Sequence, residues 1–325
     1  MKKSLIALAV LASVAGAAQA EYTLYGIADV WLGRTSSTNA AGVDTNKTQM
    51  ASGGLSGSRL GFKGSKDLGQ GLTGVFKLEH GFELDTGKDK DAASNFNRQA
   101  FVGLAGGFGE VTFGNTWTAM DDVLGAANSG FDSALSASNN VLKVPGAYAS
   151  NPGNTIKYTS PSIAGFGLGA SHSMNEGDVT KAKVSDISLS YAVGALATNL
   201  AYQQQSKTST AAEMKLTGFN ASYDLGIVKL LGSVGQFKQL TAQSTDVQFG
   251  VDVPVGAKLT VSAGFASSKD KATATTAKVE RSGFGVAAGY QLAETTTVYG
   301  GFRQAETKSS KVEDNTVAIG IKHTF

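Results

Sequence analysis

The sequence contains no cysteine and only 4 prolines, and its 28 basic residues nearly balance 26 acidic ones. The lack of cysteine excludes disulfide staples and thiolate metal sites, so hydrogen bonds or a large core must hold the fold. The scarcity of proline is compatible with many paired strands, because proline interrupts sheet interiors. No apolar run after the first twenty residues approaches the ~18 residues of a spanning helix. The charge balance gives no indication of a nucleic-acid partner.

Glycine is abundant, at 41 of 325 residues, which is roughly twice its usual share. Short alternating stretches recur along the chain. Val247, Phe249, Val251 and Val253 alternate with polar or small residues, and residues 186–193, 258–265 and 283–290 repeat the pattern. A period of two predicts β-strands with one apolar face and one polar or small face.

Turn signals divide the chain into about sixteen such segments. The predicted strands are 22–34, 56–65, 71–83, 95–105, 108–116, 153–160, 163–174, 184–194, 196–206, 214–224, 226–238, 245–253, 257–268, 279–291, 295–306 and 313–325. Short turns alternate with longer polar linkers, which we place at 35–55, 86–94, 239–244 and 269–278. An even number of antiparallel strands, with short turns at one end and long loops at the other, is typical of an outer-membrane barrel.

A soluble β-sandwich or β-solenoid adhesin would also alternate, because its strands bury one face and expose the other. Three features favour the barrel. The second face is persistently glycine, serine, threonine or charged, and both ends of the chain read as strands that could close on each other. The third is a set of aromatic residues near strand ends, expected in interfacial girdles: Tyr22, Tyr25, Trp31, Phe82, Phe108, Tyr158, Tyr290, Tyr299 and Phe325.

Residues 1–20 predict a cleaved signal peptide. Lys2 and Lys3 precede an apolar run over residues 5–14, and Ala18-Gln19-Ala20 forms a small-residue cleavage site. The run is too short for a membrane anchor. We therefore expect an exported chain whose residues 21–325 form a single barrel domain, with 26 basic and 26 acidic residues once the two leader lysines are removed.

Five ordered strings carry a resemblance to a known family. They are TLYGIADV (23–30), SRLGFKGSKDLGQGLTGVFKLE (58–79), RQAFVGLAGGFGEVTFG (98–114), NTIKYTSPSIAGFGL (154–168) and the final HTF. The sequence resembles the general trimeric porins of Gram-negative outer membranes, in their β-proteobacterial branch. This resemblance implies a transmembrane, all-β barrel of sixteen antiparallel strands that passes small hydrophilic solutes and ions by passive diffusion. It also implies a homotrimer, contacts with outer-membrane lipid and lipopolysaccharide, insertion by the outer-membrane assembly machinery, and no cofactor.

Residues 116–151 lack clear alternation, and a connection of this length is usually functional. From the residues alone, an ordinary exposed loop explains it equally well. In the porin family the third long loop folds into the barrel and narrows it. The resemblance thus implies that 116–151 is a constriction loop, with Asp121, Asp122 and Asp132 as its acidic side.

The family places arginines on the wall opposite this loop, at positions that match Arg59 and Arg98. Strand parity agrees for Arg59, since Leu60 and Phe62 take the lipid side. Parity is less favourable for Arg98, because Gln99 would then face outward, which would suit it only in a subunit contact. Inward parity also holds for Lys63, Lys77 and the lumen acid Glu79, and Lys157 joins the basic set. A charge facing lipid near the bilayer midplane would cost roughly 2–4 kcal/mol.

The sequence departs from the family pattern at two places. Asn115 stands where these porins commonly have a basic residue, and Lys157 and Thr159 stand where they often have arginine and aspartate. The choice between anion and cation selectivity therefore stays open.

Other chemistry is not indicated. The glycine run at 106–109 joins two strands with no helix after it, so it predicts a turn. His80, His172 and His323 have no ligand companions at useful spacing, and neither G-x-S-x-G nor H-E-x-x-H occurs. We predict a protein that is not an enzyme and has no cofactor or metal site. The alternatives are a substrate-specific channel, for which the inward faces are poor in aromatic residues, and an adhesion barrel that binds through its surface loops.

The last predicted strand, 313–325, alternates as far as Phe325. We expect it to pair with the first strand near residues 22–30, with Phe325 in the periplasmic aromatic girdle. The resemblance implies that this aromatic residue is also the signal read by the assembly machinery.

Overall fold

The alternating segments form one antiparallel barrel. The structure is a computed structural model and describes residues 20–272 and 278–325. Residues 1–19 of the predicted signal peptide therefore lie outside the described residues. Within the described ranges, no helix has the length and apolar character needed to cross a membrane.

The strands and short helices have the following bounds: β1 (Ala20–Thr38), β2 (Asp44–Ser52), β3 (Arg59–Gly69), β4 (Leu72–Glu83), β5 (Lys88–Asp89), β6 (Gln99–Gly106), β7 (Gly109–Asn115), α2 (Asp121–Leu124), η1 (Gly130–Asp132), β8 (Thr155–Thr159), β9 (Phe166–Ser173), β10 (Val184–Val193), β11 (Leu196–Gln205), β12 (Met214–Asp224), β13 (Lys229–Gln239), β14 (Ala242–Val255), β15 (Leu259–Asp270), β16 (Glu280–Ala293), β17 (Thr296–Thr307) and β18 (Val312–Thr324).

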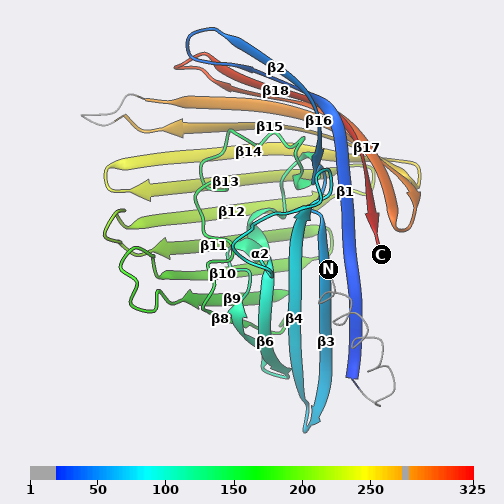
Figure 1. Cartoon of the computed structure of the whole chain (residues 1–325), viewed down its shortest axis with the longest axis vertical. Coiled ribbons are helices and arrows are strands. Elements are labelled where there is room, and N and C mark those ends of the chain that lie inside the picture. The colour runs from blue at the N-terminus through cyan, green and yellow to red at the C-terminus, as the bar shows by residue number, and fades with distance from the viewer. Residues whose placement is uncertain (1–19, 273–277) are drawn as a thin grey trace.

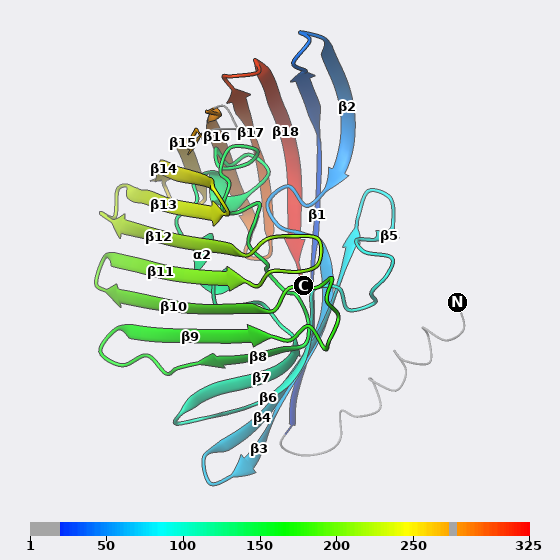
Figure 2. The ribbon, with the colours of Figure 1, turned by 90° about the vertical axis from the view of Figure 1, so that its left-hand side faces the viewer.

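The wall consists of 16 strands, as predicted. Strands β2 and β5 are additions: β2 pairs with the far half of β1, and β5 pairs with the end of β4. The other strands follow each other around the wall in sequence order, which Figure 1 shows from one side and Figure 2 after a quarter turn. Residues 27–38 of β1 pair with β18, so the first and last strands close the barrel and leave no free edge between them.

The two faces of each strand match the sequence alternation. In β18, Val317 and Ile319 are 54% and 66% exposed, whereas Thr316 and Ala318 between them are 4% exposed. Large apolar side chains are therefore on the outer face, the reverse of a water-soluble protein, and small or polar ones are on the inner face. This inside-out arrangement excludes the β-sandwich, whose apolar faces would meet in a core.

The aromatic girdle prediction is wrong for three residues. Trp31 and Tyr299 are buried against Leu135 and Ala318. The Tyr25 hydroxyl donates to the inward carboxylate of Glu79. The strand register places all three side chains on the inner face. The side of the wall that an aromatic ring takes therefore depends on strand parity and not on its distance from the end of the strand. The expectation of an inner face poor in aromatic residues is wrong for the same reason.

Two linker predictions also need correction. Residues 35–55 are mostly paired, because β1 and β2 form a hairpin that extends the wall. Residues 239–244 are not a long loop, because Gln239 pairs directly with Ala242 across a tight turn in which Leu240 has φ 52°. Polar composition marked both as loops, although threonine- and glutamine-rich segments also pair well at a rim exposed to water.

Candidate functional site

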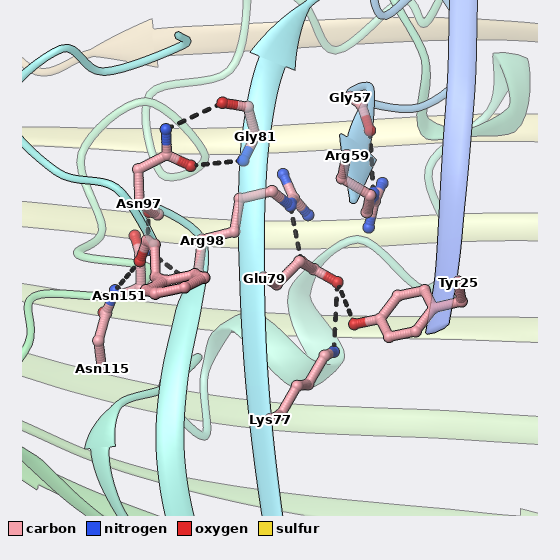
Figure 3. Close-up of polar contacts among 11 residues, drawn as sticks. Tyr25, Gly57, Arg59, Lys77, Glu79, Gly81, Asn97, Arg98, Asn115 and Asn151 are labelled. Atoms are coloured by element: carbon pink, nitrogen blue, oxygen red, sulfur yellow. Dashed lines mark hydrogen bonds and ion pairs between the residues drawn. The ribbon is translucent and has the colours of Figure 1, made fainter. Parts of the chain in front are cut away.

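The candidate site begins with a buried carboxylate on β4. Glu79 is 1% exposed, and its two oxygens have different partners. Its Oε1 accepts from Arg98 Nε at 2.7 Å, and its Oε2 accepts from the Tyr25 hydroxyl at 2.7 Å and lies 3.4 Å from Lys77 Nζ. Figure 3 shows these groups converging on Glu79, with Tyr25 from β1, Lys77 from β4 and Arg98 from the position just before β6. We call Glu79 with Tyr25, Arg98 and Lys77 the Glu79 cluster.

Arg59 lies beside the Glu79 cluster without bonding to its carboxylate. It begins β3, and its Nε donates to the Gly57 carbonyl at 2.9 Å. Arg59 and Gly81 are register partners on β3 and β4, next to the pair formed by Gly61 and Glu79. Arg59 and Arg98 thus lie near each other on the wall, on either side of Glu79 (Figure 3).

Arg98 is held by the backbone around it. Asn97 exchanges two hydrogen bonds with the backbone of Gly81, at 2.8 and 3.0 Å, and Asn151 donates to the carbonyls of Asn97 and Arg98. The Arg98 guanidinium also stacks over Trp117, 5.1 Å from the ring centroid. The sequence did not predict these asparagines as site residues. Asn97 contacts a neighbouring strand and Asn151 comes from a distant loop, so their positions relative to Arg98 in the sequence gave no sign of the contacts.

The expected conflict between Arg98 and Gln99 does not occur. Strand β6 begins at Gln99, so Arg98 lies before the regular alternation. Gln99 pairs with Glu79 in the register and is 5% exposed, which puts it on the inner face. The prediction that Gln99 would face outward is wrong because parity applies only inside the strand.

Lys63 and Lys77 share the next row of the inner wall. They are direct register partners on β3 and β4, and their ammonium groups lie 5.4 and 5.7 Å from the Tyr25 ring centroid. Lys63 is exposed. The wall thus carries four cationic groups close to one carboxylate, and its local charge is positive.

Of the three predicted acids, Asp122 bridges the segment 116–151 to the wall, whereas Asp121 has its hydrogen-bond partner inside the segment. Asp122 Oδ2 lies 2.5 Å from Lys157 Nζ on β8, and Asp121 Oδ1 accepts from the Tyr148 hydroxyl at 2.7 Å. Asp121 and Asp122 occupy α2 at the start of the segment.

Burial raises the pKa of both Asp121 and Asp122 above the ordinary aspartate value. The hydrogen bond from Tyr148 opposes this increase in the pKa of Asp121, and the positive charges of Lys157 and Arg98 oppose it further. Lys157 has the same opposing effect on the pKa of Asp122. Arg98 therefore acts electrostatically on the acidic segment.

Asp132 lies apart from the basic wall. Its Oδ1 accepts from Asn128 at 2.6 Å within the same segment, and burial raises its pKa. Asp132 and the preceding Phe131 both have positive φ, 49° and 62°, which non-glycine residues rarely adopt. Of the three acids, the structure therefore joins only Asp122 to a cationic partner within 4.0 Å, in the part of the chain that it describes.

Polar side chains of later strands hold the segment 116–151. Asp186 accepts from the Met120 N–H at 2.9 Å, Asp246 from the Val144 N–H at 2.7 Å, and Ser262 from the Gly130 N–H at 2.7 Å. Gln203 both accepts from and donates to Ala149. These anchors were not predicted as site residues, although Asp186 and Asp246 were visible as acids on the polar face of alternating strands.

A fully buried carboxylate on β1 fixes the turn next to Arg59. Asp29 accepts from the backbone N–H groups of Gly54, Leu55 and Ser56 at 3.1, 2.8 and 2.7 Å, and from the Tyr299 hydroxyl at 2.5 Å. The Gly54 carbonyl in turn accepts from Ala134 of the segment 116–151 at 2.8 Å. Asp29 thus holds the turn whose Gly57 carbonyl accepts from Arg59 and whose Gly54 carbonyl accepts from the segment 116–151.

Residues 7–310 match the profile of a family described as Gram-negative porin. The chain belongs to the Gram-negative porin family. An outer membrane porin protein of Bordetella pertussis is 28% identical over the full length of both chains. Among solved structures, an anion-selective porin from Comamonas acidovorans has a TM-score of 0.79 at 24% identity, covering 94% of this chain and 100% of that one. A trimer form of OmpT from Vibrio cholerae has a TM-score of 0.72 at 18% identity, with 94% and 100% coverage.

This porin is a general diffusion channel for small solutes across the Gram-negative outer membrane. The identification explains the inside-out arrangement, because the outer apolar side chains meet lipid and the inner polar ones meet water. The family and the names of its relatives indicate a channel and not an enzyme.

Proposed function

We propose that this porin selects solutes at a waist between the Glu79 cluster with Arg59 on one side and the segment 116–151 on the other. The observation that carries this proposal is the contact between Asp122 and Lys157, which ties the acidic segment to the same inner wall that carries the cationic groups. Opposed charges in a narrow passage create a transverse field, which orients dipolar solutes and disfavours apolar ones.

The waist favours anions weakly. Among Arg59, Arg98, Lys63 and Lys77, the ion pairs within 4.0 Å in the described part of the chain are those of Arg98 and Lys77 with Glu79, which is buried behind Arg98. On the other side, Lys157 offsets Asp122. The excess of positive charge exposed to solutes lies on the wall, and the anion-selective character of the similar Comamonas acidovorans porin agrees with this sign. Asn115 supplies no charge there and keeps the preference modest.

The functional unit is a homotrimer, a proposal supported by the trimer form of the Vibrio cholerae neighbour and by the resemblance to trimeric porins. We also assign residues 1–20 to a cleaved signal peptide, 21–325 to the barrel domain and Phe325 to the assembly signal. Outer-membrane lipid and lipopolysaccharide would then surround the trimer.

Single-channel recording in planar bilayers tests the channel and its waist together. We expect large ohmic current steps in groups of three, and a reversal potential of the anion-selective sign in a potassium chloride gradient. Correctly folded trimers that do not conduct would contradict the channel. A conducting channel with cation selectivity would contradict the proposed waist charge and leave the channel intact.

A further inference from the structure

A second feature of the inner wall adjoins the Glu79 cluster, with which it shares Lys77, and lies toward the turn between β3 and β4. A pocket of about 400 Å³ opens there, and its lining includes Thr23, Lys63, Ser65, Lys77, Phe101 and Glu110. No residue of the segment 116–151 lines the pocket, so the pocket is separate from the acidic side of the proposed waist.

Two like charges face each other in this pocket. Lys63 and Lys77 are direct register partners, and like charges in that relation are destabilising unless an anion lies between or beside them. Lys77 shares the Glu79 carboxylate with Arg98, at 3.4 Å against 2.7 Å for the arginine. Lys63 makes no ion pair within 4.0 Å in the described part of the chain. Glu21 and Glu110 also line the pocket, but neither makes an ion pair within 4.0 Å in the described part of the chain. The lysine pair therefore lacks a close anionic partner of its own beyond the shared Glu79, and an anionic group can bind between the two ammonium groups.

An aromatic ring lies next to this cationic pair. Phe101 of β6 is the register partner of Lys77, and both face inward. Its ring is partly exposed on the inner face. Contact with a second aromatic ring would remove apolar surface of Phe101 from lumen water, which is favourable. Phe101 therefore offers an apolar contact beside the two ammonium groups.

We propose that this pocket is a binding site for small aromatic carboxylates, with the carboxylate between Lys63 and Lys77 and the ring against Phe101. The proposal rests on the channel function, because solutes reach the pocket through the lumen. The pocket volume of about 400 Å³ can hold a single-ring compound together with some water molecules. Glu110 and Glu21 also line the pocket on the side of the β3–β4 turn. They disfavour a second carboxylate on the ligand and tolerate an amino group.

The test is benzoate titration of single channels of the full-length protein, after each variant has shown chloride conductance and heat-resistant folding. We expect millimolar benzoate to reduce the chloride current and acetate to reduce it far less. Lys63→Gln should weaken the benzoate block by about tenfold, the effect of one charge-assisted hydrogen bond. Phe101→Leu should bring the benzoate block down to the level of acetate.

Lys322→Gln provides the matched control. Lys322 also faces the inner wall, as the register partner of Asp29, but lies outside the pocket. Its loss should leave the benzoate block unchanged. Equal block by acetate and benzoate, or equal sensitivity to Lys63→Gln and Lys322→Gln, would overturn the aromatic carboxylate site. Loss of chloride conductance in the unmodified protein would instead overturn the channel function.

Discussion

Arg59 and Arg98 differ in how their charges are neutralised, although they occupy one patch of the wall. Arg98 shares its charge with Glu79, whereas Arg59 donates to a backbone carbonyl and keeps its full charge for the lumen. Arg59 should therefore contribute more to selectivity than its neighbour does.

We expect Arg59→Ser to shift the channel toward cations. Removing one uncompensated charge near the ion path costs an anion about 1 kcal/mol, or about fivefold in the chloride-to-potassium permeability ratio. Arg98→Ser should also shift the ratio toward cations, because it exposes the Glu79 carboxylate. The reversal potential in a salt gradient measures both, with Lys229→Ser as a control at an inner-wall position paired with Asp252. An unchanged potential in both arginine variants would mean that the waist lies elsewhere.

At the residue scale, sequence parity was enough for side chains within regular strands. Arg59, Lys63, Lys77 and Glu79 all lie on the predicted face, because a period of two leaves only two choices. The partners of these residues could not be predicted. Asp29 is visible as an inward acid, but the N–H groups it accepts belong to a turn 25 to 27 residues away.

In the proposed waist, the segment 116–151 is the element whose position decides the width of the channel. Its contacts with the wall are specific enough to test by crosslinking, since the protein has no cysteine of its own. A Cβ atom on Gly235 of β13 would lie 3.3 Å from the Val144 Cβ, close to the ~3.5–4.5 Å found across disulfides.

We expect the pair Val144→Cys and Gly235→Cys to form a disulfide readily, with single-channel conductance nearly unchanged because the segment is already in place. The pair Val144→Cys and Gly264→Cys is the control, because Gly264 neighbours Ser129 and not Val144. Electrophoresis with and without reductant measures the crosslink. Equal crosslinking in the two pairs would contradict the position of the segment.

Acidification should make the channel more anion-selective. Burial raises the pKa of Asp121 and Asp122, so their protonated forms appear at a higher pH than for ordinary aspartates. As pH falls, these acids lose their negative charge at a higher pH than ordinary aspartates do, while the arginines keep their charge. The change in reversal potential should be centred at a pH above 3.8, which is the pKa of an unperturbed aspartate.

The double variant Asp121→Asn and Asp122→Asn should lack this transition and be more anion-selective at neutral pH. Asp178→Asn is the control, because Asp178 lies on an exposed loop and hydrogen bonds from Thr180 lower its pKa. A pH profile that is identical in the double variant and the unmodified channel would contradict an acidic side formed by these residues.

At the element scale, all sixteen predicted strands correspond to strands of the wall. For the irregular segment 116–151, the sequence predicted its position in the chain but not its conformation. Alternation is a local signal, so it survives in the sequence alone. The path of 116–151 depends on Asp186, Asp246 and Ser262, which are 66 to 132 residues from the groups they hold. No local pattern encodes such contacts.

The barrel as a whole depends on the seam between β1 and β18. Gly26 and Phe325 exchange backbone hydrogen bonds of 2.9 and 3.1 Å, and the Phe325 ring covers Gly26 so closely that a Cβ atom there would collide with it. The absence of a side chain at Gly26 thus gives the ring its place on the outer face of the seam.

We expect Phe325→Ala to lower the amount of folded barrel in the outer membrane and to destabilise it by about 1 kcal/mol, because only part of the ring is buried. The conductance of the surviving channels should not change, since the ring lies outside the lumen. Heat-modified mobility and single-channel recording measure the two effects. Ile227→Ala, at an exposed apolar position in the turn between β12 and β13, is the control. A normal yield of equally stable barrels would contradict a role for Phe325 in closure or assembly.

The anchors of the segment 116–151 also set an order of events during biogenesis. Five of the strands that supply its main-chain partners, β10, β11, β14, β15 and β17, come later in the chain than the segment itself, whereas Gly54, which accepts from Ala134, comes earlier. The segment cannot bind them until those strands have paired and brought their carboxylates and amides together. We therefore expect the proposed waist to form late, after these strands have joined the wall. On this expectation, a barrel in the course of assembly would lack the selectivity of the finished channel.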